Sequence, residues 1–300
     1  PDHAEAHNGL CLAHLNLAAN DRQKQKYLPK LASGQMIGSW CLSEPNCGTD
    51  AAALTCRAEK TSAGWVLSGQ KMWVTSGKRA GLYVIMARTK PEPGSRSISA
   101  FIVERGAKGL EIGEPEDKMG MRGSDTVPLG LENCEIPAEN LVGELHHGYV
   151  DALKVLDEGR SLVGAIAVGL ARGCLEEAVK YAAERKAFGK ALHEHQAIQF
   201  KLADMETQVE AARILVRQAA AATDAGRPDK ELASIAKLFA SEMSGKVGWD
   251  AIQIFGGAGY TKDVCVERLT RDAKLCEIGE GTSEVQRMLI ARAEFARRSA

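Results

Sequence analysis

A single carboxylate, Glu280, lies in a Gly-Glu-Gly turn near the end of the chain. The flanking glycines let the backbone approach a ligand closely and adopt dihedral angles that a Cβ would forbid. An amphipathic helix is predicted after the turn, capped by Thr282 or Ser283, with an apolar stripe of Val285, Met288 and Leu289. Glu280 is therefore a candidate catalytic base, although a glutamate at a helix start also simply complements the helix dipole.

Two other segments, residues 40–50 and 71–76, each combine an indole with hydroxyl groups at the ends of predicted strands. A flat aromatic ligand stacked on Trp73 is one interpretation, with Ser43, Thr49 and Thr75 hydrogen-bonding its polar edge. A core tryptophan beside turn hydroxyls explains each segment equally well. Taken separately, the two segments leave both interpretations open.

Nucleotide-binding motifs in their usual context are missing from this sequence. The glycines of residues 255–259 follow a predicted helix rather than a strand, so neither a Rossmann nor a P-loop site is indicated. Residues 185–189 offer a cation and an aromatic ring, and residues 253–257 offer an amide and bare backbone N–H groups. Dispersed contacts to a dinucleotide would use such groups, but each segment alone is also explained by helix caps and bundle contacts.

The composition is that of an ordinary globular protein, with 45% apolar and 26% charged residues in a chain of 300. The net charge of −1 gives no field that would attract nucleic acid or an anionic membrane. No apolar run reaches membrane-spanning length and no signal sequence is recognised. Because the chain opens at Pro1, we expect a fragment or a processed product.

The eight cysteines are scattered and contain no Cys-x-x-Cys pair. This pattern predicts free thiols in a reducing compartment rather than a disulfide framework or a zinc site. His193 and His195 are two residues apart, so they would point in different directions on a helix. We expect no metal site.

The pattern of apolar, β-branched and turn residues divides the chain into three parts. Residues 1–35 are predicted to be helical. In residues 36–147, short β-rich runs at 65–67, 73–75, 82–85 and 98–103 alternate with turn residues, including those around 91–94 and from Pro128 to Pro137. This alternation indicates an antiparallel β-sandwich or barrel.

Residues 148–300 are predicted to be helical, with helices near 149–185, 193–224, 229–255, 262–274 and 282–298. The first four form a predicted four-helix bundle and the fifth packs beside it. The second helix has a seam with alternating steps of four and three residues: Ile198, Leu202, Met205, Val209, Ala212, Val216 and Ala219. The third is predicted to pack through Leu232, Ile235, Phe239, Val247, Ala251 and Ile254.

The order of motifs along the chain resembles that of the acyl-CoA dehydrogenase family over essentially all 300 residues. The motifs are Ser-Glu-Pro-x-x-Gly-Thr-Asp (43–50), Gly-Gln-Lys-Met-Trp-Val-Thr (69–75), Met-Gly-Met-Arg-Gly-Ser-Asp-Thr (119–126), Glu-Arg-Lys-Ala-Phe-Gly (184–189), Glu-His-Gln (194–196), Gln-Ile-Phe-Gly-Gly-Ala-Gly-Tyr (253–260), Arg-Asp-Ala-Lys (271–274) and Glu-Gly-Thr-Ser-Glu-Val-Gln-Arg (280–287). Eight motifs in this order are highly specific.

The resemblance implies a multidomain α+β fold. Residues 1–35 would be the remnant of an N-terminal helical domain that is otherwise absent, residues 36–147 the central β-domain, and residues 148–300 the C-terminal bundle. FAD is held between the last two domains in such enzymes. The family also implies an acyl-CoA substrate, a homodimer or homotetramer, an electron-transferring flavoprotein as partner, and a place in fatty acid β-oxidation. The compartment would be the bacterial cytoplasm or the mitochondrial matrix.

The resemblance assigns roles to residues of both domains. FAD-binding positions are Trp40, Leu42, Ser43, Gly48, Thr49, Trp73, Thr75, Arg185, Ala187, Phe188, His195, Gln196, Gln253, Gly256, Gly257, Thr282 and Glu284. In the family, those at 253–257 come from a neighbouring subunit. Substrate-binding positions are Thr49, Asp157, Arg160 and Gly279.

Glu280 falls where many family members place the catalytic base. Some relatives supply the base from the residue before the arginine that matches Arg160, but here that residue is Gly159, which cannot act. Glu158 is adjacent and should point elsewhere by about 100° of helix rotation. Glu280 is therefore the expected base.

Three departures from the family pattern affect the site. Gly279 stands where an aromatic residue is frequent, so we expect tolerance of branched or bulkier acyl groups. Ala187 replaces a commonly polar residue, and Asn46-Cys47 replace smaller ones. The alternatives to a dehydrogenase are an oxidase or monooxygenase on the same scaffold, and a non-catalytic scaffold or inert fragment.

Overall fold

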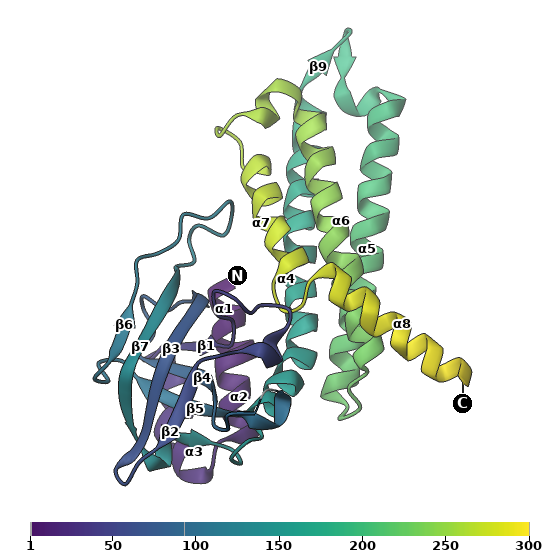
Figure 1. Ribbon diagram of the computed structural model, residues 1–300. Coiled ribbons are helices and arrows are strands. Elements are labelled where there is room, and N and C mark those ends of the chain that lie inside the picture. The colour runs from purple at the N-terminus through teal and green to yellow at the C-terminus, as the bar shows by residue number, and fades with distance from the viewer. Residues whose placement is uncertain (1, 93, 300) are drawn as a thin grey trace. The chain divides into compact units, whose positions relative to one another are not determined.

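The computed structural model describes residues 2–92 and 94–299, which fold as two compact units. Pro1–Asp117 with Arg122–Gly159 form one, here called the β unit, and Lys118–Met121 with Arg160–Ala300 form the other, the helical unit (Figure 1). The expected order of short N-terminal helices, a central β-sheet domain and C-terminal helices is confirmed. None of the helices in the described residues has the length and apolar character needed to cross a membrane.

Helices open the β unit: α1 (Asp2–Glu5), a π-helix (Ala6–Leu12), α2 (Ala13–Ala18) and α3 (Asp21–Ala32). The start of α3 is a capping box, in which Asn20 and Gln23 each accept a hydrogen bond from the other's backbone N–H. Leu15, Tyr27 and Leu31 of these helices are buried against one face of the sheet.

The sheet of the β unit has eight strands in the order β6-β7-β3-β2-β4-β5-β8, with β1 added beside β4. Most pairings are antiparallel, as predicted, but β1 and β2 pair with β4 in parallel. The strands are β1 (Gly38–Cys41), β2 (Arg57–Lys60), β3 (Gly64–Thr75), β4 (Leu82–Arg88), β5 (Ile98–Glu104), β6 (Leu110–Ile112), β7 (Thr126–Pro137) and β8 (Leu141–Val142).

Strand β4 is buried on both faces, and its alternate side chains enter two different cores. Leu82, Val84 and Met86 pack with the N-terminal helices, whereas Tyr83 and Ile85 pack with β3 and β7. Although β3 and β5 are not neighbours in the sheet, Trp65 of β3 meets Phe101 of β5 edge-on at 5.1 Å. The sheet therefore curls so that its two halves enclose the second core.

The region from Pro128 to Pro137 is a strand, so the prediction of turns there is wrong. Pro128 lies in β7 opposite a bulge, where Met72 and Trp73 of β3 both face it between the pairs Lys71–Leu129 and Val74–Val127. At a bulge the ladder is interrupted, so the N–H that proline lacks is not needed.

The helical unit contains the C-terminal part of α4 (Gly148–Glu184) together with α5 (Gln196–Asp224), α6 (Lys230–Phe255), α7 (Val266–Ile278) and α8 (Ser283–Ser299). A small hairpin, β9 (Lys186–Ala187) and β10 (Lys190–Ala191), joins α4 to α5. All five predicted helices are present, with α7 beginning four residues later than predicted. The buried seam of α5 is also confirmed.

The predicted core face of α6 is wrong for its first half. Phe239 is exposed, and Leu232 and Ile235 are only half-buried, whereas Ala233, Ala236 and Ala240 form the core seam with Met243 and Val247. Small residues allow the neighbouring helices to approach closely, so volume rather than hydrophobicity decides which face is buried.

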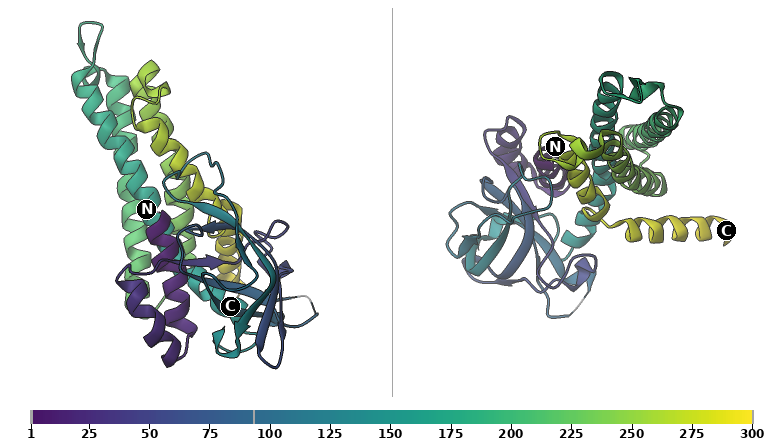
Figure 2. Two further views of the ribbon diagram at one scale, coloured as in Figure 1. Left: turned by 90° about the vertical axis from the view of Figure 1, so that its left-hand side faces the viewer. Right: turned by 90° about the horizontal axis from the view of Figure 1, so that it is seen from above.

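Helix α8 leaves the other helices at an angle, and its last turns project clear of them (Figure 2). Its buried side chains are the polar Ser283 and Gln286, while Met288 of the predicted apolar stripe is exposed. The start of α8 is therefore its anchored end.

Candidate active site

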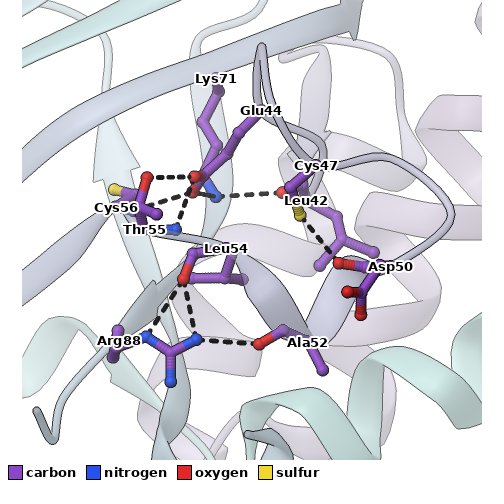
Figure 3. Close-up of polar contacts among 10 residues, drawn as sticks. All are labelled: Leu42, Glu44, Cys47, Asp50, Ala52, Leu54, Thr55, Cys56, Lys71 and Arg88. Carbon is purple, nitrogen blue, oxygen red and sulfur yellow. Dashed lines mark hydrogen bonds and ion pairs between the residues drawn. The ribbon is translucent and has the colours of Figure 1, made fainter. Parts of the chain in front are cut away.

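A buried ion pair fixes the loop between β1 and β2, which carries several predicted flavin contacts (Figure 3). Lys71 Nζ lies 2.8 Å from Glu44 Oε1 and donates to the Leu42 carbonyl at 3.0 Å. The Glu44 carboxylate also accepts from the N–H of Thr55 at 2.6 Å and of Cys56 at 2.9 Å. The two ends of the loop are thus tied to one carboxylate.

Burial by itself would raise the pKa of Glu44, but the nearby charge of Lys71 and the hydrogen bonds to the carboxylate outweigh it. The pKa of Glu44 therefore lies below its usual value. Further along the loop, Arg88 donates to the carbonyls of Ala52 and Leu54 at 2.8 Å (Figure 3). The loop is braced along its length by charged side chains that point inward.

Trp73 stands out from the β3 bulge with 59% of its surface exposed. Its φ of 59° is in the left-handed region, which a bulky side chain adopts only under constraint. The adjacent Met72 N–H donates to the Ser43 carbonyl at 3.0 Å, and Ser39 Oγ donates to the Thr75 carbonyl at 2.7 Å. The structure therefore brings Ser43, Trp73 and Thr75 together at one end of β3.

Other predicted positions of the β unit differ in accessibility. Leu42 is buried and Trp40 is half-buried, whereas Gly48 and Thr49 are exposed at the tip of the loop. A Cβ added at Gly48 would meet nothing within 4 Å, so this part of the loop has room for a ligand. Asp157, in α4, is half-buried.

His14 supports Trp40, although no sequence motif singles it out. The Trp40 indole N–H donates to His14 Nδ1 at 3.2 Å. Burial lowers the pKa of His14 to about 4, against a smaller opposing effect of Asp151. The imidazole is therefore neutral near pH 7 and able to accept this hydrogen bond.

The predicted adenosine and pyrophosphate contacts lie around the hairpin of the helical unit. His195 Nε2 is 3.1 Å from the Ala187 carbonyl, and its ring meets the Phe188 ring edge-on at 6.2 Å. Phe188 is 98% exposed and has a φ of 51°, while Arg185 and Gln196 are also exposed. An aromatic ring this accessible is available to a ligand or to another chain.

Gln253, Gly256 and Gly257 lie at the C-terminal end of α6 and are exposed. A Cβ at either glycine would meet nothing within 4 Å. Phe255 stacks on Tyr181 of α4 with ring centroids 4.2 Å apart, so this segment lies near the same end of the helical unit as the hairpin.

Glu280 occupies the turn between α7 and α8. Its φ is 52° and that of Gly281 is 92°, so two successive residues are left-handed. Both carboxylate oxygens of Glu280 are inaccessible to solvent. Lys237 Nζ and Gln286 Nε2 donate to the Gly281 carbonyl at 2.7 Å and 2.9 Å. The predicted base is thus buried in a strained and firmly held turn.

Residues beside the turn have different roles. Thr282 rather than Ser283 caps α8, since its Oγ1 accepts from the Val285 N–H at 3.4 Å. Glu284 is exposed in the first turn of α8, and Arg160 is buried with Nη1 3.4 Å from Ser234 Oγ.

Four polar residues that the sequence analysis missed form a buried stripe on α6. Ser234, Lys237, Ser241 and Ser244 are spaced by three, four and three residues, and none is more than 1% exposed. Ser241 Oγ donates to the Cys276 carbonyl at 2.8 Å, next to the end of α7. This helical spacing of polar residues was visible in the sequence, and Lys237 and Ser241 of the stripe contact the turn and the end of α7.

The comparisons with known proteins agree along the chain. The family model for the acyl-CoA dehydrogenase middle domain matches residues 39–134, and that for the C-terminal domain matches residues 146–295. Mitochondrial isovaleryl-CoA dehydrogenase of Oryza sativa is 44% identical over 290 residues, which cover 97% of this chain and 71% of that protein.

Solved structures give the same result. Butyryl-CoA dehydrogenase from Megasphaera elsdenii is 41% identical with a TM-score of 0.96, covering 98% of this chain and 77% of that one. The structure described as PigA with FAD and proline is 29% identical with a TM-score of 0.94, covering 98% and 77%. With two family models matching in order, and relatives above 40% identity covered over more than two thirds of their length, this chain belongs to the acyl-CoA dehydrogenase family.

Proposed function

We propose that this acyl-CoA dehydrogenase converts an acyl-CoA thioester to the trans-2-enoyl thioester, with Glu280 as the base that removes the α-proton. The α-C–H of a thioester is weakly acidic, so a positioned carboxylate is required. The observation that carries the proposal is the burial of both Glu280 oxygens in a glycine-flanked turn. Burial disfavours the charged form of a carboxylate and makes it a better base than one in water.

The alternative base position has no usable side chain. Gly159 stands there, and the adjacent Glu158 is exposed on α4. This contrast with the buried carboxylate of Glu280 supports the assignment.

FAD is the cofactor implied by the family, and exposed groups of this chain fit it. Trp73 presents a bare indole face, with the backbone carbonyls of Ser43 and Thr75 held beside it. When bound, FAD would accept the hydride from the β-carbon. Trp73 would stack on the flavin ring, and Trp40, Leu42, Ser43, Gly48, Thr49 and Thr75 would line it. From the helical unit, Thr282 and Glu284 would add contacts.

The exposed end of the helical unit suits binding of the FAD that is held by a neighbouring subunit. Eighteen residues of α6, about 27 Å of helix, separate Lys237 beside the predicted base from Phe255. The predicted adenosine contacts at 253–257 lie at that far end, so they suit a neighbouring chain in a homodimer or homotetramer.

Gly279 supports a preference for branched or bulky acyl groups. Its φ of −66° and ψ of 150° suit any residue, and an added Cβ would meet only the Leu275 carbonyl, at 3.5 Å. The backbone therefore does not require glycine here, and the missing side chain leaves room beside the base. Asp157 and Arg160 are proposed to contact the CoA arm.

Electron-transferring flavoprotein is the proposed electron acceptor, in bacterial cytoplasm or mitochondrial matrix. An oxidase on the same scaffold would instead pass electrons to oxygen. Oxygen consumption compared with dye-coupled turnover separates the two.

The proposed base is tested by Glu280→Gln, which we expect to keep FAD and to slow flavin bleaching by acyl-CoA about 10²–10⁴-fold. The measurement is anaerobic mixing with a panel of acyl-CoAs while flavin absorbance is followed. Glu158→Gln makes the same change at the exposed neighbouring carboxylate and should leave the rate unchanged. Near-normal bleaching by Glu280→Gln would show that the base is elsewhere.

Gly279→Tyr tests the proposed substrate class in the same assay. The bulky side chain should lower kcat/KM for branched acyl-CoAs about tenfold or more, and that for short straight chains much less, because it fills the space beside the base. A wild-type enzyme that accepts only short straight chains would remove the idea.

A further inference from the structure

Two side chains from different helices donate to one backbone oxygen in the Glu280 turn. Lys237 Nζ of α6 is 2.7 Å from the Gly281 oxygen, and Gln286 Nε2 of α8 is 2.9 Å from it. Gln286 Nε2 also lies 3.5 Å from the Glu280 carbonyl oxygen. Both side chains are fully buried. A carbonyl oxygen has two lone pairs, so these donors satisfy it completely.

The backbone of this turn does not hold its conformation by itself. A non-glycine residue in the left-handed region is destabilised by about 1–2 kcal/mol, and Glu280 is such a residue. Strain of this kind persists only where surrounding contacts enforce it. By fixing the Gly281–Thr282 peptide, one residue beyond Glu280, the two donors limit where the Glu280 carboxylate points.

Lys237 differs from Gln286 because it brings a charge. Burial lowers the pKa of Lys237 to about 8, so the ammonium form predominates at neutral pH. The ionisable groups that act on it are Cys276 and Glu277 of α7, Glu280 of the turn, and Arg160 of α4. The interaction with Glu280 is attractive and therefore favours the ionised carboxylate.

We propose that Lys237 is a positioning residue of the active site: it locks the Glu280 turn through the Gly281 carbonyl, and its positive charge keeps the carboxylate ionised. Gln286 shares the first role and has no charge for the second. The inference rests on the proposed role of Glu280 as the base.

The test compares Lys237→Met and Gln286→Met in the FAD-loaded enzyme. Each change removes one donor to the Gly281 oxygen and keeps a side chain of similar length. We expect kcat to fall about 10²-fold in both, with KM little changed, because a misplaced base affects the chemical step. The acid limb of the kcat–pH profile should move to higher pH only in Lys237→Met, because only that change removes a positive charge.

A control and a readout without turnover complete the test. Lys246→Met removes an exposed lysine from the same helix and should change neither quantity. Hydrogen exchange of residues 279–286 in substrate-free protein should speed up in Lys237→Met and Gln286→Met but not in the control. If Lys237→Met does not fold, Lys237→Arg replaces it, and its acid limb should stay at the wild-type pH because the charge is kept.

Each contrary result would overturn a different part of the proposal. Wild-type kcat and an unmoved acid limb in Lys237→Met, alongside an inactive Glu280→Gln, would overturn the inference and leave the proposed function intact. An equal shift of the limb in Lys237→Met and Gln286→Met would overturn the role of charge. An active Glu280→Gln would instead remove the base assignment itself.

Discussion

Among the residues that the structure describes, each unit of this protein buries one lysine completely, and the two lysines have different partners. Lys71 of the β unit lies 2.8 Å from the Glu44 carboxylate, whereas Lys237 of the helical unit donates to the neutral Gly281 carbonyl. Both also brace a loop that carries predicted site residues. The difference is the direct ion pair that Lys71 makes with Glu44.

This difference indicates two uses for a buried cation. Where a carboxylate neutralises the lysine, each ion depends on the other, and the pair is a structural brace. Lys237 donates to a carbonyl; burial lowers its pKa to about 8, and its charge acts on its surroundings. The first arrangement holds the loop that carries the predicted flavin contacts, and the second, on our inference, tunes the proposed base.

The largest expected effect is on stability in Lys71→Met, which leaves Glu44 buried without its cation. The β unit should lose about 3–5 kcal/mol of unfolding free energy, whereas Lys237→Met should change the helical unit by less than about 2 kcal/mol, since Gln286 still satisfies the Gly281 oxygen. Urea unfolding followed by tryptophan fluorescence reports mainly the β unit, and far-ultraviolet circular dichroism reports the helices.

A matched control for this prediction is the double variant Glu44→Leu with Lys71→Met, which removes both ions. It should recover much of the lost stability, because an apolar pair replaces the charged one. Equal losses in the two single lysine variants would break the comparison.

The next effect is the pH dependence of stability, which should fall in different pH ranges in the two units, on the acid side in the β unit and on the alkaline side in the helical unit. The lowered pKa of Glu44 gives the β unit stability that is present above the usual carboxyl pKa and lost as pH falls through the lowered value. The lowered pKa of His14, about 4, acts in the same direction. The β unit loses unfolding free energy as pH falls from 6.5 through about 4, because the buried imidazole becomes protonated. The β unit should therefore be sensitive to acid.

Lys237 affects the alkaline side. Its pKa is lowered from 10.5 to about 8, so the unfolded chain binds more protons between these values and stability rises with pH across that window. The rise amounts to at most about 3 kcal/mol. Burial raises the pKa of Cys174 to about 12, which lowers the stability of the helical unit as pH rises. The quantity to measure is therefore the unfolding free energy of the wild type minus that of Lys237→Met at each pH. A difference that is flat from pH 8 to 10 would contradict the prediction.

The smallest expected effect on stability is that of Trp73→Ala, two residues from Lys71 on the same strand. Trp73 is 59% exposed, so the apoprotein should change by less than about 1 kcal/mol. FAD affinity should fall about tenfold or more through the loss of the stacking surface. Thermal unfolding and FAD titration measure the two quantities. Trp249→Ala, at an exposed tryptophan outside the predicted site, should change neither.

Periodic patterns in the sequence predicted the elements well where one face is buried throughout. The α5 seam, with its steps of four and three, is buried as predicted from Met205 to Ala219. The same reasoning failed for α6, because alanines rather than the larger Phe239 face the core. The prediction of a turn at Pro128 was also wrong, because this proline lies in strand β7 opposite a bulge. Periodicity predicts that a helix has a buried face, but close packing with the neighbouring helices decides which residues lie on that face.

The sequence by itself determined the family, the order of helical and β-rich parts, and a glutamate between two glycines in front of a helix, because these depend on local spacing and motif order. Only the tertiary structure decided that Lys71 meets Glu44, that Trp73 stands out from a bulge, and that Lys237 reaches Gly281. These contacts join residues that packing brings together from different elements. Local sequence patterns do not specify such contacts, since the partner of a buried polar group depends on which chain segments enclose it.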